Sequence, residues 1–242
     1  FLFFICIIVC TLIITYWAAK RSTTTNRFYT TAGSLTGFQN GMAIAGDFIS
    51  AASFLGIVGT IAINGYDGFL YSIGFLVSYL VVLFLIAEPV HHLGKYSLGD
   101  VVCSRFPGIE MRWMMAIGTF MISIFYMIPQ LVASGFLLRL LLDIDYSISV
   151  AVIGGLMTVY VVFGGMVATS WVQIVKTIVL MSGTFLLSLI VFSHFNWSMT
   201  DFMQRVQEGT PLGEQFFQPG HLFGNPLEFL SLQLALVLGT AG

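Results

Sequence analysis

Residues 43–56 read Ala43-Ile44-Ala45-Gly46-Asp47-Phe48-Ile49-Ser50-Ala51-Ala52-Ser53-Phe54-Leu55-Gly56. They lie inside an apolar stretch from Gly37 to Ile63, in which Asp47 is the only acidic residue. At about 1.5 Å per helical residue, Asp47 lies roughly 15 Å along the helix from Gly37, near the centre of a bilayer. An ionised carboxylate is costly at that depth, so we expect Asp47 to face protein or a water-filled cavity and to have a partner.

The residues around Asp47 weaken the helix and supply oxygen atoms. Gly46 has a low helix propensity, and the hydroxyls of Ser50 and Ser53 compete for backbone hydrogen bonds. A broken membrane helix exposes carbonyls that have lost their i+4 partners. We therefore predict a cation site here, in which Gly46 and Ile49 supply backbone carbonyls to sodium, and Asp47 and Ser50 supply side-chain oxygens. The alternative is an acid that only ties neighbouring helices together by hydrogen bonds.

The composition is that of a helical protein embedded in a lipid bilayer. Hydrophobic residues make up 57% of the chain and charged residues 8%, whereas soluble domains are about 25% charged. Mean hydropathy is +0.95, and several apolar runs reach the length of a membrane-spanning helix. The sequence has no basic patch for nucleic acid, no Ser/His pair, no paired intramembrane carboxylates and no metal motif, so we expect neither a nucleic-acid partner nor an enzyme.

The hydrophobic pattern predicts an all-α polytopic membrane protein with seven segments. The fifth segment is short for a span, and it can cross if the Gly164-Gly165 corner lies among the headgroups. The predicted segments are roughly Phe1–Ala18, Gly37–Ile63, Phe69–Ala87, Trp113–Leu142, Ile148–Phe163, Val167–Phe192 and Leu227–Gly242.

The basic residues predict the orientation. Seven of the nine Lys and Arg residues fall on one side of the predicted segments. The positive-inside rule then places the N-terminus outside and the Lys20–Thr36 loop in the cytoplasm of a multi-pass plasma-membrane protein (the inner membrane if the source is bacterial). We also expect a short helix near Ser97–Arg105 in a cytoplasmic loop. A long external loop follows from Ser193 to Pro226, with an amphipathic piece at Met199–Gln207.

Polar residues in two further segments are candidates for a substrate site. Gln130 follows Pro129, which should kink its helix; Gln130 either lines a substrate cavity or only satisfies the kink. Gly239 and Thr240 predict a second break, and two interrupted helices are typical of a transporter site. The candidate substrate-binding residues are therefore Ser53, Gln130, Gly239 and Thr240.

The junction between the fifth and sixth segments carries its own signals. The Gly164-Gly165 pair allows a tight turn. Thr169 or Ser170 is expected to cap the following helix. Gln173 and Lys176 lie three residues apart and share a helix face. We favour snorkelling of Lys176 to the cytoplasmic headgroups over a role in a site.

Several of these stretches resemble the sodium:solute symporter family, and within it the cation/acetate symporter branch. The resemblance covers essentially the whole chain, and its second and third motifs are specific at the level of the family. The matching stretches are Arg27-Phe28-Tyr29-Thr30-Thr31-Ala32-Gly33 with Gly37-Phe38-Gln39-Asn40-Gly41, then Gly46 through Gly56, Tyr160 through Lys176, and Leu238-Gly239-Thr240-Ala241-Gly242.

The resemblance implies the N-terminal portion of a LeuT-type fold, in which two five-helix inverted repeats follow an extra N-terminal helix. Residues 1–242 would form a single transmembrane transporter domain, cut at both ends. Residues 1–36 would hold the extra helix and a cytoplasmic loop, and residues 37–193 the first repeat. Residues 194–242 would hold the external loop and the start of the second repeat.

The same resemblance implies a sodium site at the first core helix. By motif match, its carbonyl ligands fall on Gly46 and Ile49, with Asp47 and Ser50 adjacent, and its remaining ligands lie beyond residue 242. Some members carry an Asp after the Gly-Gly corner that is tied to a second sodium site. This chain has Gln173 there, so the resemblance does not carry a second sodium to it.

Together these observations predict a secondary active transporter that works by alternating access. Its expected partners are a sodium ion, which is the coupling ion rather than a cofactor, and a small organic anion, acetate or another short monocarboxylate. The alternative is a transporter-like membrane sensor that forms part of a larger signalling protein. A kinase or receiver domain in the full-length sequence would favour the sensor.

Overall fold

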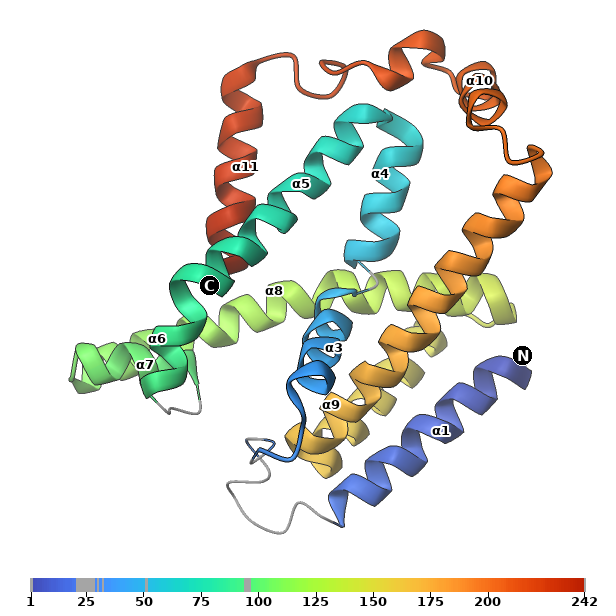
Figure 1. The fold of residues 1–242 in the computed structure, drawn as a ribbon. Helices are drawn as coiled ribbons and strands as arrows, with labels where there is room; N and C mark the ends of the chain where they lie inside the picture. The colour runs from blue at the N-terminus through green and yellow to red at the C-terminus, as the bar shows by residue number, and fades with distance from the viewer. Residues whose placement is uncertain are drawn as a thin grey trace. The chain divides into compact units, whose positions relative to one another are not determined.

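The computed structural model describes residues 2–20, 29, 31, 33–50, 52–93 and 97–241. Every regular element in these ranges is helical, as the sequence predicts for an all-α membrane protein (Figure 1). Four of the seven residues of the Arg27–Gly33 motif, and much of the predicted Lys20–Thr36 loop, lie outside the described residues. The chain divides into two compact units, and each is described by itself: residues 1–53 with 108–185, and residues 54–107 with 186–242.

The first unit contains the helices that carry the predicted cation site. They are α1 (Leu2–Ala19), α3 (Gly37–Phe48), α8 (Ile109–Leu142) and the larger part of α9 (Tyr146–His194). Helix α3 begins with a capping box, in which the Thr36 hydroxyl accepts from the Gln39 backbone and the Gln39 side chain accepts from the Thr36 backbone. This cap fixes the start of the helix that carries Asp47.

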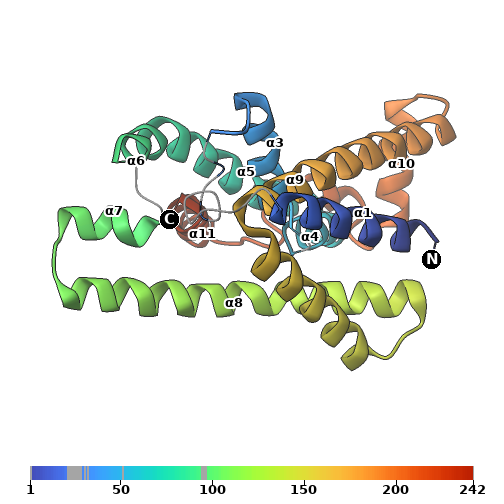
Figure 2. The ribbon, with the colours of Figure 1, turned by 90° about the horizontal axis from the view of Figure 1, so that it is seen from below.

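Helix α9 covers both the predicted fifth and the predicted sixth segment. Gly165 has φ 60° and ψ −167°, values outside the helical region, so the helix changes direction there, as Figure 2 shows. A positive φ costs little for glycine because it has no Cβ. The predicted corner at Gly164-Gly165 is therefore present. Thr169 does not cap the second half, because its hydroxyl donates to the carbonyls of Gly165 and Met166 instead.

Helix α1 packs along α9 in the first unit (Figures 1 and 2). The Trp17 and Trp171 rings meet edge to face with centroids 6.3 Å apart. The Thr11 and Tyr160 hydroxyls lie 3.0 Å apart, within hydrogen-bond distance. Ala18, Val167 and Ala168 form the small buried cluster at this contact. Small residues let helices approach closely within a membrane.

The second unit is built around the hairpin of α4 and α5. It contains η1 (Ala52–Gly56, from Phe54 on), α4 (Ile57–Asn64), α5 (Tyr66–Val81), η2 (Val82–Ile86), α6 (Ala87–Leu93), α7 (Leu98–Arg105), α10 (Met199–Gly209), η3 (Gly213–Phe217) and α11 (Pro226–Ala241). The predicted short helix near Ser97–Arg105 is α7, with Ser97 as its N-cap. The predicted amphipathic piece is α10.

Helix α11 packs closely against α5. Gly74 of α5 lies against Gln233 and Leu236, and the Gln233 side-chain amide donates to the Leu70 carbonyl at 3.1 Å. The predicted break at Gly239 and Thr240 is wrong for the described part of this helix, which is helical from Pro226 through Ala241. An isolated glycine costs only about 1 kcal/mol in a helix, too little to interrupt one that is already packed.

Among the residues that the structure describes, three helices are long and apolar enough to cross a membrane, by length and composition: Tyr66–Leu93, Ile109–Leu142 and Tyr146–His194. A fourth span results if Gly37–Phe48 and Ser53–Asn64 count as one broken helix. Ile5–Ala18 and Pro226–Gly239 are shorter apolar helices. All seven predicted segments fall on helices, because α9 accounts for two of them. That each segment crosses the bilayer stays a prediction.

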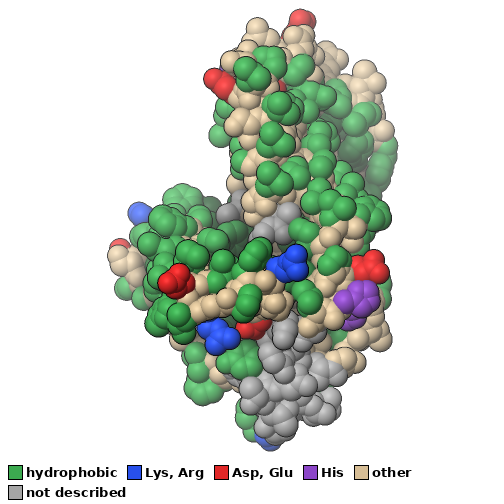
Figure 3. All heavy atoms as spheres, turned by 90° about the vertical axis from the view of Figure 1, so that its left-hand side faces the viewer, with side chains coloured by type: hydrophobic (Ala, Val, Ile, Leu, Met, Phe, Trp, Pro, Cys, Tyr) green, Lys and Arg blue, Asp and Glu red, His purple; other side chains and the backbone are tan. Residues whose placement is uncertain are grey.

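Large hydrophobic side chains cover much of the surface. Green side chains predominate over much of the face in Figure 3, with a few charged groups between them. Ile122 is 70% exposed and Phe120 66% exposed on α8, and Phe84 is 74% exposed in η2. Exposed apolar area of this extent marks a surface that contacts lipid or other protein. The chain is accordingly a multi-pass membrane protein.

Candidate functional site

The helix that carries Asp47 breaks directly after it. Helix α3 ends at Phe48, and Ile49 leaves the helical region with φ −77° and ψ 80°. The last regular bond joins the Ile49 amide to the Ala45 carbonyl at 3.0 Å. The Ser50 amide turns back to the Phe48 carbonyl at 2.8 Å. The Gly46 carbonyl thereby loses the donor that a continuous helix would give it, as the sequence predicts for a broken helix.

Ser50 and Ser53 close the break. The Ser53 hydroxyl accepts from the Ser50 amide at 2.8 Å, and the Ser50 hydroxyl accepts from the Ser53 amide at 3.1 Å. The Ser53 hydroxyl also lies 2.8 Å from the Phe48 carbonyl, to which it donates. Ser53, predicted as a substrate contact, therefore forms local bonds that hold the broken backbone in one shape. A role toward substrate stays a prediction for this residue.

Gln130 reaches the break from α8. Its side-chain amide donates to the Ser50 hydroxyl at 2.9 Å. Helix α8 continues through Pro129, and both interpretations of Gln130, the wall of a substrate cavity or satisfaction of the kink, stay predictions. The structure places Gln130 beside Ser50, one of the predicted cation ligands. The two residues are 80 apart in the chain, and the sequence analysis does not predict their contact.

Asp47 is bonded across to the second half of α9. The Gln173 side-chain amide donates to Asp47 Oδ1 at 3.0 Å. This bond is of the kind that the alternative interpretation requires, in which the acid ties helices together. It occupies Oδ1 and leaves Oδ2 for another ligand. The bond joins residues 126 apart in sequence, and local sequence patterns do not contain such pairings.

Lys176 lies one turn beyond Gln173 on α9 and is half-buried. Its ammonium interacts electrostatically with the Asp47 carboxylate. The one ion pair between described side chains joins Arg205 and Glu208, at 3.8 Å, so Asp47 and Lys176 form no direct salt bridge. Lys176 adds positive potential at Asp47 without occupying its oxygens. The predicted snorkelling of Lys176 to the headgroups does not include this effect on Asp47.

Close backbone packing fixes α3 on α9 at this point. Gly46 is buried, and a Cβ at this position would collide with the Gln173 carbonyl oxygen and the Thr177 hydroxyl. Thr177 also donates to the Met42 carbonyl at 3.0 Å. A glycine is required where two backbones come this close. The residue before Asp47 therefore has a packing role in addition to its predicted carbonyl ligand.

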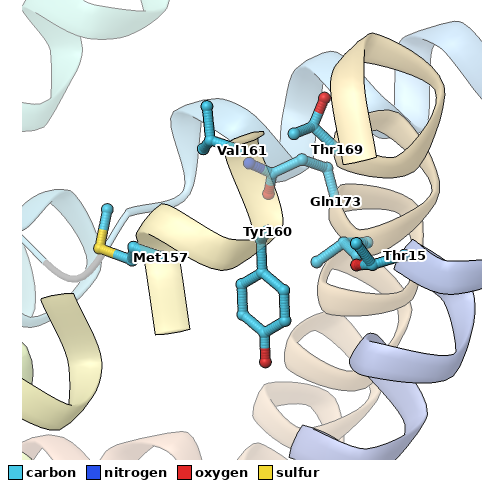
Figure 4. Close-up of a pocket in the computed structure, with 7 residues that line it drawn as sticks. Thr15, Met157, Tyr160, Val161, Thr169 and Gln173 are labelled. Carbon is cyan, nitrogen blue, oxygen red and sulfur yellow. The ribbon is translucent and has the colours of Figure 1, made fainter. Parts of the chain in front are cut away.

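A cavity of about 150 Å³ lies next to Gln173 (Figure 4). Its walls come from α1 and from both halves of α9, and most of its surface is apolar. Gln173 contributes to the wall, while its Oε1 is buried without a hydrogen-bond partner. The residues that line the cavity are Thr15, Met157, Tyr160, Val161, Thr169, Val172 and Gln173.

The structure brings together one part of the predicted site. Asp47, Ser50, Ser53 and Gln130 belong to the first unit, where hydrogen bonds place them around the break with the Gly46 and Ile49 backbone. Gly239 and Thr240 belong to the second unit. Within the described ranges no three His, Cys, Asp or Glu side chains gather as metal ligands, so the oxygens at the break are carboxylate, hydroxyl and carbonyl groups. These are the ligand types that hard cations prefer.

Comparison with known protein families identifies the family of this chain. The model of the sodium:solute symporter family matches residues 28–242. The chain belongs to this family. It is also similar to the uncharacterized symporter YwcA of Bacillus subtilis (strain 168), with 58% identity over 242 residues. That match covers 100% of this chain and 47% of the relative, so the chain spans about half the relative's length. No solved structure matches the chain.

Proposed function

We propose that the full-length protein is a secondary active transporter of the plasma membrane. It couples the inward movement of sodium to the uptake of a small organic anion, acetate or another short monocarboxylate. Family membership supports solute symport. The observation that carries the sodium assignment is the Gly46 carbonyl, which lacks its helical donor next to the Asp47 carboxylate.

Four residues at the break are the proposed ligands of the coupling ion. Gly46 and Ile49 contribute backbone carbonyls, and Asp47 and Ser50 contribute a carboxylate and a hydroxyl. Unwound backbone in membrane transporters binds sodium because its carbonyls have no intrahelical partner. The family resemblance assigns the remaining ligands to residues after 242. The proposed site is therefore completed by the rest of the full-length protein.

The proposed substrate contacts are Ser53 and Gln130 near the break, together with Gly239 and Thr240 of α11. The preference for a monocarboxylate rests on the resemblance to the cation/acetate symporter branch. Coupling follows if sodium and the anion both bind one conformational state more tightly than the other, because ligands shift an equilibrium only by their difference in affinity for the two states. No bond is made or broken in this cycle.

Uptake by the full-length protein tests the proposal. The protein is reconstituted into liposomes, and entry of radiolabelled acetate is followed with and without an inward sodium gradient. We expect uptake that exceeds equilibrium only when the gradient is present. Uptake of acetate that is equally concentrative in a proton gradient without sodium would reject sodium as the coupling ion. Uptake of another monocarboxylate, and not of acetate, would reject acetate while keeping symport.

A further inference from the structure

We propose that Gln173 is a positioning residue for Asp47, and that its amide sets the sodium affinity of the break by holding the carboxylate in place. The inference rests on the proposed function, because it concerns the same site. No sequence signal assigns this role to Gln173, which stands where some family members carry an acid.

The bond between the two residues leaves Asp47 able to bind a cation. Gln173 Nε2 donates to Asp47 Oδ1 at 3.0 Å. A hydrogen bond to an ionised acceptor is about twice as strong as one between neutral groups, so it restricts the carboxylate to one orientation. The bond uses one oxygen, and Oδ2 remains available. A neutral donor can stay in place when sodium arrives, whereas a lysine ammonium in direct contact would repel it.

The Gln173 amide has no second bond in the described structure. Its Oε1 is buried without a hydrogen-bond partner, and buried polar atoms of this kind are uncommon enough to require an explanation. One side of the residue borders the cavity of about 150 Å³ (Figure 4). The bond to Asp47 is therefore the interaction that orients the amide, and the two side chains position each other.

The backbones on both sides of this bond are fixed. Gly46 lies directly against the Gln173 carbonyl, and the Thr177 hydroxyl donates both to Met42 of α3 and, at 2.9 Å, to the Gln173 carbonyl. The donor Gln173 is thus held on a fixed part of the helix pair, and its acceptor Asp47 directly follows Gly46, whose carbonyl has lost its helical donor. This is the arrangement by which a second residue improves ligand geometry without touching the ion.

Equilibrium binding of radioactive sodium to the purified full-length protein tests the role of Gln173. In Gln173→Met the side chain keeps a similar length and loses the amide. We expect the dissociation constant for sodium to rise about tenfold, the amount typical of losing a residue that orients a metal ligand, with the number of sites unchanged. Gln173→Asn keeps the amide but shortens its reach by one methylene, and we expect a rise in the same direction.

Gln233→Met is the matched control. Gln233 also donates a cross-helix hydrogen bond, to the Leu70 carbonyl at 3.1 Å, but in the second unit. We expect a lower melting temperature for this variant and an unchanged sodium dissociation constant. If the role of Gln173 were merely structural, Gln173→Met and Gln173→Asn would also show a lower melting temperature with an unchanged sodium dissociation constant.

The outcomes separate the two proposals. Saturable sodium binding in the wild type, with dissociation constants in both Gln173 variants within twofold of it, overturns the positioning role and leaves the proposed function intact. Absence of saturable sodium binding in the wild type rejects sodium coupling and the positioning role together. If Gln173→Met fails to fold, Gln173→Asn alone decides between these outcomes.

Discussion

The Asp67 carboxylate anchors the backbone of Leu222, 155 residues further along the chain, through a hydrogen bond of 2.6 Å from the Leu222 amide to Oδ2. The Gly220 amide donates to Oδ1 at 3.0 Å. Asp67 is 1% exposed, so these amides replace the water that the carboxylate loses on burial. The same turn brings Gly65, at φ 58°, against the Phe216 carbonyl. The segment from Phe216 to Leu222 is thereby fastened to the start of α5.

Asp67→Asn is expected to destabilise the protein by about 2–3 kcal/mol, because the NH2 group that replaces one carboxylate oxygen cannot accept from a backbone N–H, and one buried donor loses its partner. The measurement is thermal unfolding in detergent, together with proteolysis within residues 216–222, which should become faster. The exposed Glu214→Gln provides the control, with no expected change. An unchanged melting temperature in Asp67→Asn would mean that the loop is held by other contacts.

Gly46→Ala is expected to separate α3 from α9. The added methyl group collides with the Gln173 carbonyl and the Thr177 hydroxyl, and overpacking of this kind costs about 1–3 kcal/mol. We expect a lower melting temperature and weaker sodium binding. Gly41→Ala in the same helix meets nothing within 4 Å and should be neutral or slightly stabilising. Equal behaviour of the two variants would contradict the close approach.

Ser53→Ala is expected to loosen the break without removing a proposed sodium ligand. The substitution takes away the donor to the Phe48 carbonyl and the acceptor for the Ser50 amide, at a cost of about 1–3 kcal/mol. Hydrogen exchange at the Ser50 amide should become faster. Ser53→Thr keeps the hydroxyl and should exchange like the wild type. Protection of the Ser50 amide in both variants would show that the serine pair does not hold the break.

Asp47→Asn is expected to raise the sodium concentration needed for half-maximal uptake at least tenfold, which corresponds to about 1.4 kcal/mol of lost cation binding. The amide retains the size of the side chain but not its charge. Uptake at several sodium concentrations measures the effect, and the quantity of protein in the membrane is determined in parallel. Wild-type sodium dependence in this variant would remove Asp47 from the proposed site and leave it as a tie between helices.

Local chemistry predicts the features that depend on neighbouring residues. Gly46, Ser50 and Ser53 weaken the helix at the point where it breaks. The corner in α9 is also a local feature, because it depends on the positive φ of a single glycine, Gly165. Ser97 caps α7 by the same local rule. Thus the helices, the corner and the break after Asp47 follow from the sequence. The sequence wrongly predicts a break at Gly239 within the described part of α11, because glycine and threonine are tolerated in a helix that packs against another.

The contacts that complete these features depend on the tertiary fold. Nothing near Gln173 in the chain indicates that it bonds to Asp47, 126 residues away. Asp67 is similar, since an acid at the start of a helix is commonly explained by the helix dipole, and its burial depends on a distant loop. The sequence indicates Gln130 as a polar residue that follows Pro129 in an apolar segment, but its bond to Ser50, 80 residues away, depends on the folded chain.

The fastening of residues 216–222 to Asp67 affects how this protein is best modified for experiments. An epitope or fluorophore inserted between Gly220 and Leu222 would pull two amide donors from a buried anion. An insertion directly after Gly209 avoids this, because α10 ends there and a Cβ added at Gly209 would meet nothing within 4 Å. A fluorophore or epitope that reports on movement in this region is therefore best placed at the end of α10, where it leaves the hydrogen bonds from Gly220 and Leu222 to Asp67 intact.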